Sequence, residues 1–408
     1  MMKRQVLIEE SRWFSARYQA LALGLAGALQ YTAPLALRAE DHADYKYEVY
    51  AEDRGRIRIR THSAYFEKEL DARIALKGEF VYDGISGASP NGKPPLPGTT
   101  EVQKTHVEDI RRAGYIEPEI KWGRNILSPQ LSYSEEHDYI SHGLALNHSM
   151  NFNDKNTTIT AGVAQTWDTI NPIFWAGRHE NKNSSDFLLG LTQLLTKTTL
   201  LTVNFTVGTS SGFLSDPYKL YYFPEYDGGI VASAFPEVRP THKTRQVFYL
   251  GLTQFVTPAN ASVDFSYRLA HDSYDIWSHT ASIAWYQNIT KYVVLSPMFR
   301  WYRQSAAYFY SQQAAMEVGD PQFNLGNDPV NAPLAGITSP FPQFYSADYR
   351  LAEMQSMTYG ISAAVRIQKW LTLDIAYKRY IMTRLDNFSF TDAFPKAHVY
   401  TFGARFIF

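Results

Sequence analysis

The sequence predicts an all-β fold, an antiparallel transmembrane β-barrel of about 16 strands (14–16). Three observations lead to this prediction: an alternating aromatic stretch at the C-terminus, apolar residues at every second position along most of the chain, and connections that alternate between short and long. A period of two indicates strands whose two faces meet different surroundings. In a barrel that crosses a lipid bilayer, these surroundings are hydrocarbon outside and a polar interior.

The C-terminal stretch 398–408 reads HVYTFGARFIF. Its alternate positions are aromatic or small and include Phe402, Phe406 and Phe408, whereas the positions between them are polar or aliphatic. The stretch resembles the closing strand of bacterial outer-membrane barrels, whose terminal aromatic residue is read by the barrel-assembly machinery. The resemblance implies a barrel of the outer-membrane type, with these three phenylalanines as the assembly signal. An edge strand of a soluble sandwich is the alternative interpretation.

Composition excludes several other classes of protein. The 408 residues carry a net charge of −1, which argues against a nucleic-acid partner, and contain no cysteine, which excludes disulfides and thiolate chemistry. The mean hydropathy of −0.30 is too polar for a helical membrane protein. Aromatic residues make up 15% of the chain, which suits the two interfacial girdles of a barrel. No glycine-rich phosphate loop is present, so no cofactor is expected.

Residues 1–39 are predicted to be a cleaved signal peptide, and residues 40–408 the barrel. The start is basic at Lys3 and Arg4, an apolar run spans residues 20–29, and Ala39 offers a small residue for cleavage. An amphipathic helix retained in the mature protein is the alternative. Export by this route predicts that the protein is located in the bacterial outer membrane, with lipid as its surroundings.

The predicted connections fall into two alternating sets. The short connections are 68–72, 123–126, 153–156, 196–198, 258–261, 288–291 and 368–369. The long connections are 85–105, 169–183, 210–242, 305–347 and 386–396. Short periplasmic turns and longer external loops are typical of outer-membrane barrels, and a multi-domain sandwich would not separate its loops by length in this way.

Four stretches resemble an uncharacterised family of Gram-negative outer-membrane proteins that is known only as a domain of unknown function. They are 83–90 (DGISGASP), 134–141 (SEEHDYIS), 213–220 (FLSDPYKL) and 302–310 (YRQSAAYFY). The resemblance covers nearly all of the predicted mature chain. It implies a barrel, and it implies no particular chemistry.

Charged residues are predicted to face the interior, because a lipid-facing surface rejects charge. On the second strand we assign Ile59 and Tyr65 to the lipid face. The predicted lumen-lining residues are Arg58, Arg60, Lys77, Glu79, Glu119, Lys121, Asp264, Arg268, Arg300, Arg366, Asp374, Lys378 and Arg405. Threonine and asparagine at 158, 160, 202, 204 and 206 predict a neutral arc. These residues either brace the wall through pairs between strands or tune a hydrated pathway.

Two His-Asp pairs, His137-Asp138 and His271-Asp272, are the weak candidates for catalysis. Carboxylate–imidazole pairs at a barrel rim can activate water. Neighbouring residues on a strand point to opposite faces, however, so each pair needs the other to make a site. Glu135, Glu136 and Asp275 lie near these pairs and are ligand types for a carboxylate–imidazole metal site, but no metal site is predicted.

The sequence therefore favours a channel or passive transporter for small polar solutes. The alternatives are an enzyme at the extracellular rim, either hydrolytic or metal-dependent, and a structural barrel that docks a periplasmic partner. The long loop from Ser305 to Ala347 carries apolar residues that prefer burial, so we expect part of it to fold into or over the lumen. Those apolar residues are Phe323, Leu325, Ile337, Phe341 and Phe344.

Overall fold

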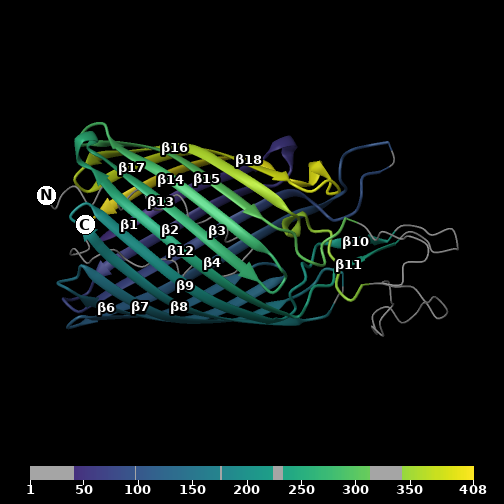
Figure 1. The fold of residues 1–408 in the computed structure, drawn as a ribbon, viewed down its shortest axis with the longest axis horizontal. Helices are drawn as coiled ribbons and strands as arrows, with labels where there is room; N and C mark the ends of the chain where they lie inside the picture. The colour runs from purple at the N-terminus through teal and green to yellow at the C-terminus, as the bar shows by residue number, and fades with distance from the viewer. Residues whose placement is uncertain (1–40, 97, 175–176, 224–232, 313–341) are drawn as a thin grey trace.

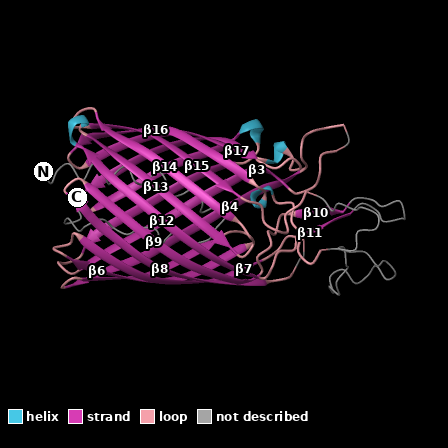
Figure 2. Ribbon diagram, in the orientation of Figure 1, coloured by secondary structure: helices cyan, strands magenta, loops and turns pink. Residues whose placement is uncertain are grey.

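The computed structural model describes residues 41–96, 98–174, 177–223, 233–312 and 342–408. Sixteen strands in this part of the chain form a closed antiparallel barrel, and a separate two-stranded sheet lies beyond one of its ends (Figures 1 and 2). The predicted fold class and strand number are confirmed. The predicted signal peptide, residues 1–39, lies outside the described residues.

The barrel closes by pairing its first strand with its last, His42 with Ile407 through Glu52 with Ala397. Its other strands pair in sequence order, except that β9 pairs with β12. The barrel strands are β1 (His42–Glu52), β2 (Arg58–Glu69), β3 (Ile74–Pro90), β4 (Lys104–Trp122), β5 (Asn125–Glu135), β6 (Tyr139–Phe152), β7 (Thr157–Ile170), β8 (Glu180–Thr196), β9 (Thr199–Gly212), β12 (His242–Val256), β13 (Ala261–Asp272), β14 (Trp277–Asn288), β15 (Val293–Gln304), β16 (Met354–Gln368), β17 (Leu371–Arg384) and β18 (Lys396–Ile407).

The remaining elements are short and lie between barrel strands. Strands β10 (Leu220–Phe223) and β11 (Ser233–Pro236) form the separate sheet. Four 3₁₀ turns complete the described elements: η5 (Asp53–Gly55), η6 (Thr257–Ala259), η7 (Tyr349–Leu351) and η8 (Thr391–Ala393). No helix among the described residues has both the length and the apolar character that crossing a membrane requires.

The two ends of the barrel differ in their connections, as the sequence predicted. The C-terminus and the start of β1 lie at one end, which we call the turn end, and the β10–β11 sheet lies beyond the other, which we call the loop end (Figure 1). The turn end carries the short connections, such as 123–124 between β4 and β5 and 369–370 between β16 and β17. In outer-membrane barrels these ends face the periplasm and the exterior, respectively.

The outer face of the barrel is a belt of exposed apolar side chains. On β18, Tyr400, Phe402 and Phe406 are 52%, 43% and 41% exposed, whereas Val399 and Thr401 between them are 1% and 5% exposed. The same alternation runs along the other strands and places Phe80, Ile116, Leu144, Phe265 and Ile361 outside. The terminal strand therefore has the two faces that its sequence predicted.

The second strand corrects one prediction. Ile59 and Tyr65 are 6% and 9% exposed and point inward, whereas Arg58 and Arg60 are exposed on the outer face, in line with Phe66. The expectation that Arg58 and Arg60 line the lumen is therefore wrong. Near the loop end the outer face extends beyond the apolar belt, so Arg58 and Arg60 are tolerated outside and Ile59 can pack inside. Tyr65 lies toward the turn end, where its hydroxyl donates a hydrogen bond to Glu67 at 3.0 Å.

Candidate functional site: the charged interior and the loop cap

The inner face of the early strands carries paired charges. Lys77 on β3 and Lys121 on β4 both contact Glu119, with Nζ–Oε distances of 2.6 and 3.2 Å. On β18, the Arg405 guanidinium donates two hydrogen bonds of 2.8 Å to Asp44 on β1. Glu79 shares the inward face of β3 with Lys77. The Lys77–Glu119 and Arg405–Asp44 pairs join neighbouring strands, whereas Lys121 pairs with Glu119 along β4, and together these contacts brace the wall.

A basic arc occupies the inner face of the later strands. Arg268 on β13, Arg300 on β15 and Lys378 on β17 point inward, and Arg300 acts electrostatically on the other two. Arg300 forms no ion pair with any residue that the structure describes. Arg300 therefore lies on the lumen side without a counter-ion among the described residues.

The remaining inward residues of the prediction lie around these arcs. Asp264 shares the inner face of β13 with Arg268, and Arg366 lies on the inner face of β16, opposite the buried Thr372. Asp374 and Arg405 line a small cavity at the turn end. On β7 and β9, Thr158, Thr160, Thr202, Asn204 and Thr206 point inward, and the buried Asp168 near the loop end of β7 adds a charge to the same face.

An apolar core closes part of the loop end. It joins the start of the β15–β16 connection with its end, the β13–β14 loop and the β17–β18 loop. Its buried members are Val102, Tyr274, Ile276, Ala307, Phe309, Tyr310, Leu351, Ala352, Met354, Met382, Ala393 and Phe394. The described parts of the 305–347 loop are therefore packed against the barrel, and Phe344 contacts this core. Phe323, Leu325, Ile337 and Phe341 lie outside the described residues.

Three loop segments are tied together by backbone pairing. Val238 and Tyr345 exchange backbone hydrogen bonds of 2.8 and 3.0 Å, although more than one hundred positions separate them in the chain. Ser311 N–H donates to the Ser346 carbonyl at 3.0 Å, and Leu220 N–H donates to Asn91 at 2.7 Å. Together with the apolar core, these segments form what we call the loop cap.

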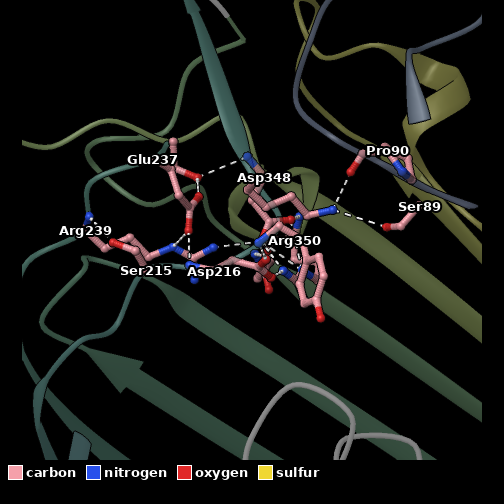
Figure 3. Close-up of polar contacts among 12 residues, drawn as sticks. Ser89, Pro90, Ser215, Asp216, Glu237, Arg239, Asp348 and Arg350 are labelled. Atoms are coloured by element: carbon pink, nitrogen blue, oxygen red, sulfur yellow. Dashed lines mark hydrogen bonds and ion pairs between the residues drawn. The ribbon is translucent and has the colours of Figure 1, made fainter. Parts of the chain in front are cut away.

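A cluster of six charged side chains lies inside the loop cap, and Figure 3 shows its contacts. The ion cluster consists of Asp216, Lys219, Glu237, Arg239, Asp348 and Arg350, so its three acids balance its three bases. Arg239 bonds Glu237 at 2.6 Å and Asp348 at 2.8 Å. Arg350 bonds Asp348 at 2.8 Å through Nε and also bonds Asp216. Asp348 is therefore held by two guanidinium groups from two different loops.

Burial sets the electrostatics of the ion cluster. The side chains of Glu237 and Asp348 are 0% and 1% exposed. Burial alone would raise the pKa of Asp348, but Arg350, Lys219 and Arg239 outweigh it and hold that pKa below its ordinary value. Burial raises the pKa of Glu237 and lowers the pKa of Lys219. Buried charges of this kind are stable only as a complete set, because each one loses its hydration.

The four stretches that carry the family resemblance meet at this cap. Lys219, in the 213–220 stretch, donates hydrogen bonds to Ser89 at 3.2 Å and to the Pro90 carbonyl, both in the 83–90 stretch. Tyr218 bonds Asp138 in the 134–141 stretch, and the 302–310 stretch supplies Phe309 to the apolar core. Sequence reasoning did not select the ion cluster. The 213–220 stretch contained two of its members, and its resemblance was the available signal.

The structure does not bring the two His-Asp pairs together. His137 and Asp138 lie in the β5–β6 connection, and β12, β9, β8 and β7 separate β6 from β13, which carries the second pair. His271 stacks on Trp277 with ring centroids 4.3 Å apart, and Asp272 bonds Lys243 at 2.8 Å. Each pair is therefore engaged in local contacts on its own side of the barrel.

One group of carboxylates near the loop end has the spacing of a cation site. Asp109, Glu136 and Asp138 each place a ligand atom within 4.8 Å of the others. Burial raises the pKa of Glu136 to about 7, Arg111 opposes this shift, and the neighbouring carboxylates add to it. Oxygen ligands of this kind suit a hard divalent cation such as Ca²⁺. Arg111, 3.7 Å from Glu136, already supplies part of the compensating charge.

A family model described as "Protein of unknown function (DUF3570)" matches residues 20–177 and 174–392. The chain belongs to this family. The match covers most of the barrel and agrees with the resemblance drawn from the four stretches. A search of curated proteins finds no match to this DUF3570 protein.

Solved structures similar to this DUF3570 protein are outer-membrane barrels of several kinds. The siderophore receptor PirA from Pseudomonas aeruginosa aligns at 9% identity and a TM-score of 0.40 over 86% of this chain and 57% of its own. A bacterial polysaccharide outer membrane secretin aligns at 10% identity and a TM-score of 0.46 over 91% and 100%. OmpT, an outer membrane protein of Vibrio cholerae, aligns at 9% identity and a TM-score of 0.40 over 90% and 97%. This chain spans little more than half the length of the PirA receptors.

Proposed function

We propose that this DUF3570 protein is an outer-membrane channel that lets small polar solutes diffuse along its charged inner face, with the loop cap limiting their entry. The segregation of charge carries this proposal. Apolar side chains cover the outside, whereas ion pairs and a basic arc line the inside. A barrel of this size encloses more space than inward side chains fill. Rings of fixed charge tune the selectivity of such pathways.

The basic arc bears on whether the channel favours anions or cations. Arg268, Arg300 and Lys378 place positive charge on one side of the lumen, and Arg300 has no ion-pair partner among the described residues. Positive charge in a low-dielectric channel concentrates anions. We therefore expect a modest preference for small anions over small cations.

Single-channel recording in planar bilayers tests the proposal. The purified protein should give discrete conductance steps, and a salt gradient should give a reversal potential on the anion-selective side. Arg300→Gln should move the reversal potential toward zero. Arg303→Gln is the matched control, because Arg303 lies on the same strand, faces outward and pairs with Glu353 at 3.2 Å.

Two results would contradict the proposal. The first is an absence of conductance, both from the wild type and from a variant whose loop cap has been loosened. The second is conductance with the same reversal potential in Arg300→Gln and Arg303→Gln, which would show that the basic arc does not face the pathway.

A further inference from the structure

Arg58 and Arg60 on β2, together with Arg112 on β4, face outward as exposed side chains. Among the described residues, none of these three side chains has an ion-pair or hydrogen-bond partner. A charged side chain on the lipid-facing surface is costly near the midplane and is tolerated close to an interface. Their depth on the barrel wall therefore decides what these arginines can contact.

An aromatic group marks that depth. Tyr47, His62 and Tyr82 occupy one register on β1, β2 and β3, and the His62 ring lies 4.8 Å from Tyr47 and 6.3 Å from Tyr82. Aromatic girdles of this kind sit at the boundary between hydrocarbon and headgroups. Arg60 and Arg58 are the next two outward residues of β2 toward the loop end. They therefore lie at the level of the headgroups.

The residues beside the two arginines of β2 have short side chains or none. Arg60 lies between Val49 and Gly84 in register, and a Cβ added at Gly84 would meet no atom within 4 Å. Arg58 lies between Ala51 and Ser86, which are also small. A headgroup can therefore approach both guanidinium groups from outside without steric hindrance.

Three other cations on the outer face are paired within the protein. Arg379 bonds Asp53 at 2.5 Å, Arg303 bonds Glu353 at 3.2 Å, and Lys68 bonds Asp41 at 2.6 Å. On β4, Arg112 has Glu135 opposite it in register, but that carboxylate accepts a hydrogen bond from Tyr133 at 3.3 Å instead. The arginines of β2 therefore lack the internal counter-charge that similar positions have.

We propose that Arg58, Arg60 and Arg112 bind the phosphate group of a phosphorylated lipid in the outer leaflet. The guanidinium fork matches phosphate oxygens and can donate two hydrogen bonds at once. The occupant is a lipid and not free phosphate, because the apolar belt continues directly below the site. Phe66 and Phe80, which are 39% and 53% exposed, offer a surface for its acyl chains. This site is on the outer wall, so it is independent of passage through the lumen.

The test measures lipid binding by the full-length protein in detergent. The probe is a diphosphorylated glycolipid of the lipid A type, and its enzymatically dephosphorylated form is the comparison. Native mass spectrometry counts the bound lipids, and a thermal-unfolding shift gives the affinity. The double variant Arg58→Gln and Arg60→Gln should bind the phosphorylated lipid about tenfold more weakly or worse, because two charge-assisted contacts are lost.

Two control variants separate a loss of the site from a loss of the fold. Arg303→Gln removes an outward arginine that is paired internally, so it should bind the lipid as the wild type does. The variant Arg58→Lys and Arg60→Lys keeps the charge but loses the paired N–H groups of the guanidinium, so its lipid binding should fall between that of the wild type and that of the glutamine variant. The dephosphorylated lipid should bind the wild type no better than the phosphorylated lipid binds the glutamine variant.

Three outcomes would overturn the proposal. Equal lipid binding by the wild type and the glutamine variant would show that the arginines are not part of the site. Equal binding of the phosphorylated and dephosphorylated lipids would show that the phosphate is not recognised. Inorganic phosphate that binds the wild type as tightly as the lipid does would show that the acyl chains contribute nothing, so the site would not be a lipid site.

Discussion

Replacing Asp348 with asparagine should loosen the loop cap and leave the barrel intact. The carboxylate is 1% exposed and accepts hydrogen bonds from Arg239 at 2.8 Å and from Arg350 at 2.8 and 2.9 Å. The amide keeps the shape of the side chain but removes its charge. Two partly buried guanidinium groups would then share the two remaining acids of the ion cluster, Glu237 and Asp216.

The size of the effect follows from burial. Breaking a buried ion pair costs about 3–5 kcal/mol, because the partner stays buried without its counter-charge. Each arginine keeps one acid here, so we expect the lower value, about 3 kcal/mol. This change raises the population of the open cap by about two orders of magnitude. It acts locally, since the sixteen barrel strands close without the ion cluster.

Hydrogen exchange read by mass spectrometry measures this change directly. The amides of Val238 and Tyr345 bond each other's carbonyls inside the cap, so they report its opening. In Asp348→Asn these amides should exchange about 100-fold faster, and barrel amides should keep their rates. Glu353→Gln is the control, because its pair with Arg303 is exposed and worth about 0–1 kcal/mol. Unchanged exchange at Tyr345 in the asparagine variant would refute the role of the ion cluster.

Three further predictions concern the barrel wall and the loop end. Phe265→Arg should lower the free energy of unfolding by about 2–4 kcal/mol near the bilayer midplane, whereas Ser266→Arg, at a position that points inward, should lower it much less. Equal folding yields of the two variants in lipid vesicles would contradict this assignment of the two faces of β13. Deleting Phe408, which is 66% exposed at the end of the chain, should deplete the protein from the outer membrane and leave unfolded chain in the periplasm, and normal surface levels would count against an assembly signal. The raised pKa of Glu136 means that the folded state favours the protonated carboxyl group. Its contribution to the stability of the folded state is therefore present below about pH 4.5 and is lost as the pH rises through about 7. Loop-end amides should therefore be better protected at pH 5 than at pH 8 after correction for intrinsic rates, and Glu136→Gln should remove most of that difference.

The period-two pattern predicted the barrel because lipid imposes it on every strand that crosses the membrane. Phe402 and Phe406 face out and Arg405 faces in for this reason, and the alternation of loop lengths followed from the antiparallel order of the strands. The expectation that charged residues face inward and apolar residues face lipid gave the wrong orientation for Arg58 and Arg60. Beyond the apolar belt there is no hydrocarbon to reject charge, so the pattern of polar and apolar residues no longer identifies the outer face.

The sequence alone determined that this chain forms a membrane barrel with a charged interior, because strand periodicity and chain order are local properties. Only the tertiary structure decided which loops meet. Asp216 and Arg350 are far apart in the chain and lie in segments without a regular pattern, and the closure of the barrel brings their loops to the same end. Pairing between such loops depends on backbone contacts like that of Val238 with Tyr345, which no periodicity encodes. The ion cluster in the cap is therefore a product of the closed fold and not of any one stretch of sequence.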